Sequence, residues 1–215
     1  MLLNLVQHLT FWTHLVRSRI KSGMTGPVLK KLFWTRVSMN KRSLIIGYGN
    51  VYCHDDGVAL HIINRLRTQS GLRELQPDED GLDELGNSLD TILLHQLVPE
   101  MITVVTQYDK VVFVDAHKGI IPDDVRVVEV KEERGFHAVT HHMSPGMLLA
   151  MARQTHPFVP EAYLISVKGE DFDFGLGLSE TCRIRADAAV QKILELVNSQ
   201  DKKSCQSNKF PKLRC

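Results

Sequence analysis

Acidic residues and histidines stand near the ends of several apolar segments of this sequence. The pair Asp55-Asp56 comes shortly after the first apolar run, and Asp115 directly follows a later one. Carboxylate and imidazole groups together form a ligand set of borderline softness, which suits nickel or zinc rather than calcium. If the fold brings these ends together, the residue types predict a metal site. Its candidate ligands are Asp56, Asp115 and His141, with His95 and His142 as additional candidates.

The segment Gly47-Tyr48-Gly49-Asn50 resembles the start of the dinucleotide-binding motif G-x-G-x-x-G. However, Tyr52 occupies the third glycine position, and two carboxylates stand where the next helix is expected to begin. A pyrophosphate needs bare backbone at a helix start, and these carboxylates would repel it. We therefore expect no nucleotide cofactor, and a Rossmann-type oxidoreductase is disfavoured.

Cys53, beside His54, raises the alternative of a thiolate nucleophile. Such a nucleophile needs an activating base and an oxyanion site, and its pKa must be low. The neighbouring Asp55 and Asp56 would raise that pKa, so we favour a structural or incidental role for Cys53. The cysteines are widely spaced without a CxxC pair, which indicates a reducing compartment. They are Cys53, Cys182, Cys205 and Cys215.

The chemistry-bearing residues have to be positioned by alternating strands and helices. Short apolar runs that end at polar residues or glycine predict buried strands. They lie at 43–47, 91–94, 111–114, 127–130 and 162–167. Helical spacing, capping serines and prolines at the first turn predict the helices. They run from about 56 to 66, over 99–107, from Ser144-Pro145 onward and over 179–198, while 69–89 is expected to be a loop.

This alternation predicts the α/β class, with a mostly parallel, twisted sheet between helices on both faces, a three-layer sandwich. Ligands of such sheets bind beyond the carboxyl ends of the strands. Asp56, Asp115 and His95 stand at predicted strand ends or at a helix start, where this rule places a site.

The net charge of +1 hides an uneven distribution. Residues 1–38 carry +6 and residues 198–215 carry +4, which leaves −9 for the body, 39–197. An acidic body is a poor platform for nucleic acid, because phosphate binding needs a clustered cationic face. It suits a cationic partner segment or a metal ion.

The basic ends are expected to lie outside the main domain. Residues 1–42 are an N-terminal extension, either a basic amphipathic targeting segment or upstream sequence before a start at Met24 or Met39. Residues 43–197 form the domain, and 198–215 a flexible basic tail. No apolar stretch is long enough for a membrane helix, so no membrane insertion is expected.

Several segments, taken in order, resemble the nickel-iron hydrogenase maturation endopeptidases. The opening segment, residues 44–57, is an apolar strand followed by G-x-G-N and an acidic pair. The further segments are His95–Glu100, Val111–Ala116, Thr140–Gly146 and Phe172–Ser179. The set is most similar to the branch that serves bidirectional, NAD-reducing hydrogenases, and it spans about residues 43–197.

The resemblance implies a five-stranded sheet and a specialised protease. Such an enzyme, an aspartyl-type endopeptidase, removes a C-terminal extension from the hydrogenase large-subunit precursor after nickel insertion and senses nickel that the substrate supplies. The resemblance places the family's metal ligands on Asp56, Asp115 and His141, and it makes Asp56 catalytic as well. Because His142 is adjacent to His141, the motif leaves open which of the two histidines is the ligand. His95 matches a family segment but no ligand position.

The resemblance further leads us to expect a cytoplasmic monomer whose partner is that precursor. An alternative from another class is a non-catalytic metallochaperone or docking factor for hydrogenase assembly, with the same fold and ligands. A soluble α/β domain of unknown role is the remaining alternative.

Overall fold

The structure is a computed structural model that describes residues 41–119, 122–133 and 143–199. The candidate ligands His141 and His142 lie outside these residues. So do the predicted N-terminal extension up to residue 40 and the predicted tail from residue 200 onward. Among the described residues, no helix has the length and apolar character needed to span a membrane.

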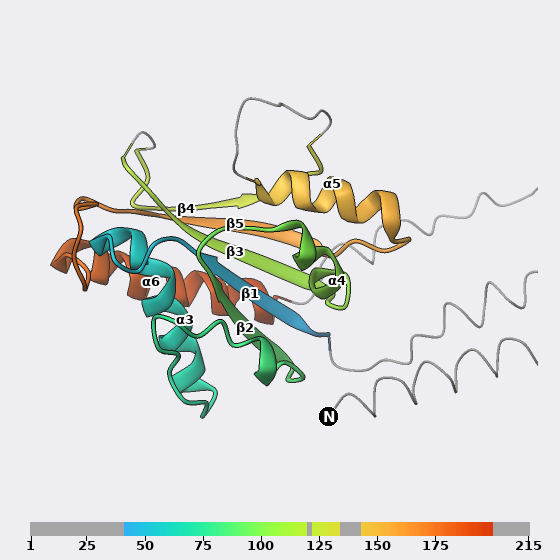
Figure 1. The fold of residues 1–215 in the computed structure, drawn as a ribbon, viewed down its shortest axis with the longest axis horizontal. Helices are drawn as coiled ribbons and strands as arrows, with labels where there is room; N and C mark the ends of the chain where they lie inside the picture. The colour runs from blue at the N-terminus through green and yellow to red at the C-terminus, as the bar shows by residue number, and fades with distance from the viewer. Residues whose placement is uncertain (1–40, 120–121, 134–142, 200–215) are drawn as a thin grey trace, which may run out of the picture. The chain divides into compact units, whose positions relative to one another are not determined.

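A five-stranded sheet forms the middle layer, with the order β2-β1-β3-β5-β4 (Figure 1). The strands are β1 (Ser43–Tyr48), β2 (Leu89–Leu94), β3 (Lys110–His117), β4 (Val125–Glu129) and β5 (Glu161–Lys168). All neighbours pair in parallel except β4, which runs antiparallel to β5 at one edge. The predicted α/β class and mostly parallel sheet are therefore confirmed.

Helices cover both faces of the sheet. Figure 1 shows α5 on one side and α3 and α6 on the other. The regular helices are α3 (Val58–Gln69), α4 (Ile102–Val105), α5 (Pro145–Thr155) and α6 (Glu180–Asn198). Short 3₁₀ turns are η1 (His54–Gly57), η2 (Leu82–Glu84) and η3 (Pro99–Met101). The helix predicted over 99–107 is thus a 3₁₀ turn followed by one short α-helix.

Two apolar layers hold the helices to the sheet, because successive strand residues point to opposite faces. Ile45 and Val112 pack with the buried faces of α3 and α6. Leu44 and Phe113 pack on the other face with Met101, Val105 and α5. Both central strands are buried on two sides, which explains their continuous apolar sequences.

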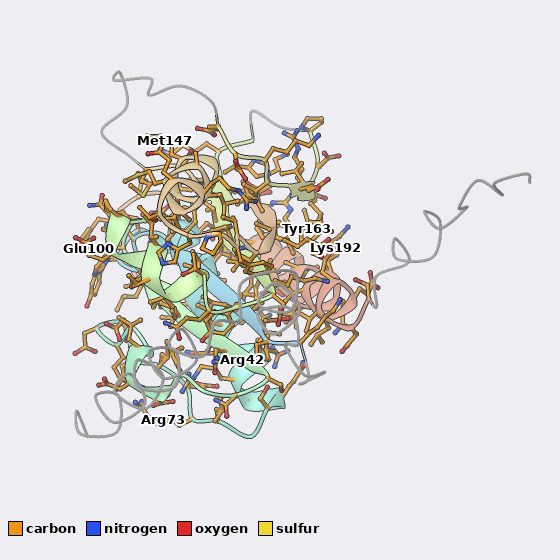
Figure 2. All side chains as sticks on the ribbon, turned by 90° about the vertical axis from the view of Figure 1, so that its right-hand side faces the viewer. Arg42, Arg73, Glu100, Met147, Tyr163 and Lys192 are labelled. Atoms are coloured by element: carbon orange, nitrogen blue, oxygen red, sulfur yellow. The ribbon has the colours of Figure 1, made fainter. Side chains whose placement is uncertain are left out.

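At the β2 edge, the buried carboxylate of Asp90 organises a polar network. It accepts hydrogen bonds from Tyr108 Oη at 2.7 Å, from Arg42 Nη2 at 3.0 Å and from the amides of Gly86 and Asn87. Burial alone would raise the pKa of Asp90, but these hydrogen bonds outweigh it and lower the pKa. Figure 2 labels Arg42 beside this side of the sheet.

Asp90→Asn is expected to lower the free energy of unfolding at pH 7 by about 2 kcal/mol, because the surrounding donors lose a charged acceptor. The lowered pKa means that the stabilisation is complete above about pH 4 and disappears as the pH falls through the folded-state value. Urea unfolding of both proteins at pH 7 and at acid pH measures this. Asp83→Asn, which changes an exposed carboxylate on η2, is the control; an equal effect in both variants contradicts the assignment.

Candidate functional site

The carboxyl ends of β1 and β3 mark the place at which this type of sheet binds ligands. From β1 the chain goes to β2 on one side, and from β2 it crosses to β3 on the other. Such a reversal of direction marks the ligand crevice in open α/β sheets. Tyr48 ends β1 beside Asp115, since Gly47 pairs with Val114 one residue earlier. The sequence predicted that this strand ends at Asp115. In the structure β3 continues to His117, so Asp115 lies inside the strand.

The glycines after β1 make room for the chain's own backbone. Gly49 has φ +145°, and a Cβ atom there would lie 2.3 Å from the carbonyl oxygen of Asp56. A Cβ on Gly47 would lie 2.8 Å from the Cβ of Ala59 on α3. The Asn50 amide then donates to Asp56 Oδ2 at 2.7 Å. The G-x-G-N sequence therefore holds η1, and Asp56 on it, against the end of β1.

Asp56 lies close enough to Asp115 for its negative charge to act on the Asp115 carboxyl. The pKa of Asp115 is raised to about 6, first by burial and also by the negative charge of Asp56. Hydrogen bonds from the Ala116 amide and the Tyr48 hydroxyl act in the opposite direction. Burial and the charge of Asp115 in turn raise the pKa of Tyr48. Among the described residues, no basic group contributes to the raised pKa of Asp115. A cation bound here would relieve the repulsion that Asp115 experiences from Asp56.

Asp55 has a different function from its neighbour. Both aspartates lie in the first turn of η1, but only Asp55 is buried. Its buried carboxylate accepts from the amides of Glu170, Asp171 and Ser179 and from the Ser179 hydroxyl, at 2.7 to 3.1 Å. Burial would raise the pKa of Asp55, but these four bonds lower it. Asp55 thereby fastens the segment after β5 to η1.

Cys53 and His54 form a further part of this attachment. Cys53 makes a parallel bridge with Gly175. The His54 ring covers Gly175, and its Nδ1 lies 3.1 Å from the carbonyl oxygen of Gly177. The thiol of Cys53 accepts from the Asn50 side-chain amide at 3.2 Å. These contacts are structural and agree with the role favoured for Cys53.

The structure unites only part of the predicted ligand set. Asp56 and Asp115 come together. His95 is exposed and lines a pocket of about 230 Å³ with Gly49, Val51 and the acidic segment 78–80, and neither Asp56 nor Asp115 is among the lining residues. In the ranges that the structure describes, no three His, Cys, Asp or Glu side chains are grouped so as to hold a metal. His141 and His142 belong to the segment outside those ranges.

Two residues of the site escape sequence reasoning. The hydroxyl of Tyr48 binds Asp115, but that contact follows from strand register and not from a motif. The partners of Asp55 lie 115 to 124 residues further along the chain. The sequence signal for a structural role of Asp55 is weak: two acids are adjacent, and one of them is enough to serve as a ligand.

Asp115→Asn is expected to raise the free energy of unfolding at pH 8 by about 1 to 2 kcal/mol in the presence of a chelator. The raised pKa makes the ionised carboxylate destabilising, so wild-type stability falls as the pH rises from about 4 to above 6. Below pH 4 the two proteins should be alike. Urea unfolding across this range measures the difference, and a variant that is less stable at pH 8 contradicts it.

Asp55→Ala is expected to lower the free energy of unfolding by about 3 kcal/mol, because several buried donors lose their acceptor. Amide hydrogen exchange should accelerate at Glu170, Asp171 and Ser179. Asp173→Asn, an exposed carboxylate of the same segment, should leave both measurements unchanged. Unaltered exchange in the Asp55 variant would show that other contacts hold the segment.

Comparison with protein-family models gives no match, and comparison with curated proteins gives none. Solved structures do show similar folds. The hydrogenase maturating endopeptidase HybD from E. coli has a TM-score of 0.53 and 17% identity, over 73% of this chain and 91% of that chain. The [NiFe] hydrogenase maturation protease HycI from Thermococcus kodakarensis has a TM-score of 0.50 and 20% identity, over 80% of this chain and 99% of that chain.

A third similar structure is the hydrogenase 2 maturation peptidase from a Thaumarchaeota archaeon. It has a TM-score of 0.50 and 24% identity, over 74% of this chain and 100% of that chain. Each of the three structures is therefore matched over at least nine-tenths of its own length. The resemblance seen in the sequence motifs is thus confirmed at the level of the fold: the described chain has the α/β fold of solved hydrogenase maturation endopeptidases.

Proposed function

We propose that this chain is an endopeptidase that removes the C-terminal extension of a nickel-iron hydrogenase large-subunit precursor after nickel insertion. It recognises the nickel that the precursor already holds. The observation that carries this proposal is the Asp56–Asp115 pair at the switch point of a fold shared with maturation endopeptidases.

The acid pair supports recognition of a cation. Two carboxylates that repel each other in a partly buried crevice gain from a divalent ion between them. Oxygen ligands alone do not select nickel, so the proposal assigns the third, imidazole ligand to His141. His141 stands two residues before Met143, which packs against the same apolar layer as Tyr48, the partner of Asp115.

The two carboxylates have separable tasks in the proposed reaction. Asp115 is held by the Ala116 amide and Tyr48, and it binds the substrate's nickel. Asp56 is held at Oδ2 by the Asn50 amide, while its Oδ1 receives no hydrogen bond from the described residues. Asp56 also binds the nickel, which brings the precursor's C-terminal segment into the crevice. Its carboxylate accepts the proton from the water that attacks the scissile carbonyl, and that proton then passes to the leaving amine.

We further propose that the partner belongs to the bidirectional, NAD-reducing hydrogenases and that the protein acts as a cytoplasmic monomer. The segments that support the branch are those quoted from the sequence, among them Phe172–Ser179.

Asp56→Asn is expected to reduce the rate of precursor processing at least about 100-fold, because the variant loses both a nickel ligand and the proton acceptor. Nickel-loaded precursor is incubated with each protein, and the mass of its C-terminal region is followed with time. Asp115→Asn should weaken binding of the loaded precursor about 10-fold or more. Thermal unfolding should show that both variants are folded.

Asp83→Asn serves as the matched control, because it removes an exposed carboxylate on η2. Processing at the normal rate by the Asp56 variant would refute the proposal. If wild-type protein binds the loaded precursor but the precursor keeps its mass, the non-catalytic metallochaperone or docking factor is the correct function.

A further inference from the structure

His54 directly precedes the two adjacent acids and has an unusual backbone conformation. Its φ is +42°, and in the ranges that the structure describes it is the only residue other than glycine with a positive φ. The left-handed region costs free energy for a residue that has a Cβ atom, so surrounding contacts have to offset that cost. Conformations of this kind persist where the surroundings hold a residue in place, often at functional sites.

The ring of His54 supplies contacts that hold this turn. Its Nδ1 lies 3.1 Å from the carbonyl oxygen of Gly177, and the ring lies over Gly175. A Cβ atom on Gly175 would collide with Nε2, so the distant segment has a glycine where the ring needs space. The His54 amide also donates to the Gly175 carbonyl at 3.0 Å. The backbone and the side chain of His54 therefore both fix the turn against the segment after β5.

The turn directs two adjacent carboxylates to different partners. Asp55 accepts four hydrogen bonds from the segment 170–179. From the described residues Asp56 accepts a single bond, which the Asn50 amide donates at 2.7 Å. Asp55 is thus held more firmly than Asp56. If the backbone at His54 relaxed to a right-handed conformation, the displacement would therefore fall mainly on Asp56.

A direct chemical role for His54 does not fit the geometry. Its Nδ1 contacts the Gly177 carbonyl, and its Nε2 lies 3.9 Å from Asp171 Oδ2 on the same segment. Among the described residues, His54 included, no three His, Cys, Asp or Glu side chains are grouped so as to hold a metal. The ring contacts the segment after β5, so its influence on Asp56 passes through the backbone.

We propose that His54 is a positioning residue, whose ring holds a left-handed turn that keeps the Asp56 carboxylate at the Asn50 amide. The inference rests on the proposed function and adds to it the residue that orients the proton acceptor. Glycine adopts the same turn without the steric cost, so the reaction needs the conformation of residue 54 and not the imidazole itself.

The test compares His54→Gly with His54→Val in the full chain, assayed with nickel-loaded large-subunit precursor. Both variants lose the ring contacts, so both should unfold at a lower temperature than wild type. A β-branched side chain opposes the left-handed turn, whereas glycine adopts it readily. We expect kcat to fall at least about 10-fold in His54→Val and to stay within about 3-fold of wild type in His54→Gly, because a displaced proton acceptor slows the reaction.

A second measurement needs no precursor. Amide hydrogen exchange at Asn50 reports its bond to Asp56. It should accelerate at least about 5-fold in His54→Val and less than about 2-fold in His54→Gly. If His54→Val does not fold, His54→Ala and His54→Asn give the same comparison, because asparagine enters the left-handed region more readily than alanine.

His156→Gly is the matched control. His156 follows α5 and has an extended backbone, with φ −130° and ψ 139°. This variant should leave both kcat and the exchange of the Asn50 amide at their wild-type values.

The outcomes separate this inference from the proposed function. An equal loss of kcat in His54→Gly and His54→Val assigns the effect to the ring and overturns positioning by the turn. Wild-type kcat in both variants also overturns the inference and leaves the peptidase standing. If wild-type protein neither binds nor cleaves the precursor, but Asn50 exchange differs between the variants as expected, the proposed function fails and the positioning of Asp56 stands.

Discussion

The close contact between Gly49 and the backbone of Asp56 is the constraint on which the site depends. The carbonyl of Asp56 occupies the space of a side chain at position 49, and the Asn50 amide then holds the Asp56 carboxylate. A glycine pattern that elsewhere admits a pyrophosphate here admits the protein's own turn. At the turn after β1, where other α/β folds bind a phosphate, this sequence therefore places a carboxylate.

The second determinant is that the fold accepts an unfavourable charge arrangement at this corner. Asp115 is partly buried near Asp56, and its raised pKa records the cost. Structural carboxylates in this protein behave in the opposite way, because Asp55 and Asp90 have lowered pKa values and full sets of donors. The contrast separates carboxylates that stabilise the fold from Asp115, whose burial near another acid destabilises its charged form.

Strands and helix starts that depend on neighbouring residues could be predicted from the sequence. The apolar run 111–114 predicted a buried strand, and Ser179 predicted a helix start whose hydroxyl does accept from the Cys182 amide. The sequence could not predict contacts set by register or by distant chain. The Tyr48 hydroxyl reaches Asp115 only because of how β1 and β3 align, and the partners of Asp55 lie far along the chain. The direction of β4 was likewise unspecified, because an apolar strand pattern is the same read either way.

The hydrogen bonds of Asp55 join residues far apart in the sequence, so they can form only late in the synthesis of the chain. A nascent chain that has left the ribosome only as far as β5 already contains both members of the acid pair. It still lacks the amides of Glu170, Asp171 and Ser179, so the buried carboxylate of Asp55 has none of these hydrogen-bond donors. Synthesis must pass the start of α6 before this corner can close. The contacts that hold η1 are therefore completed only late in synthesis.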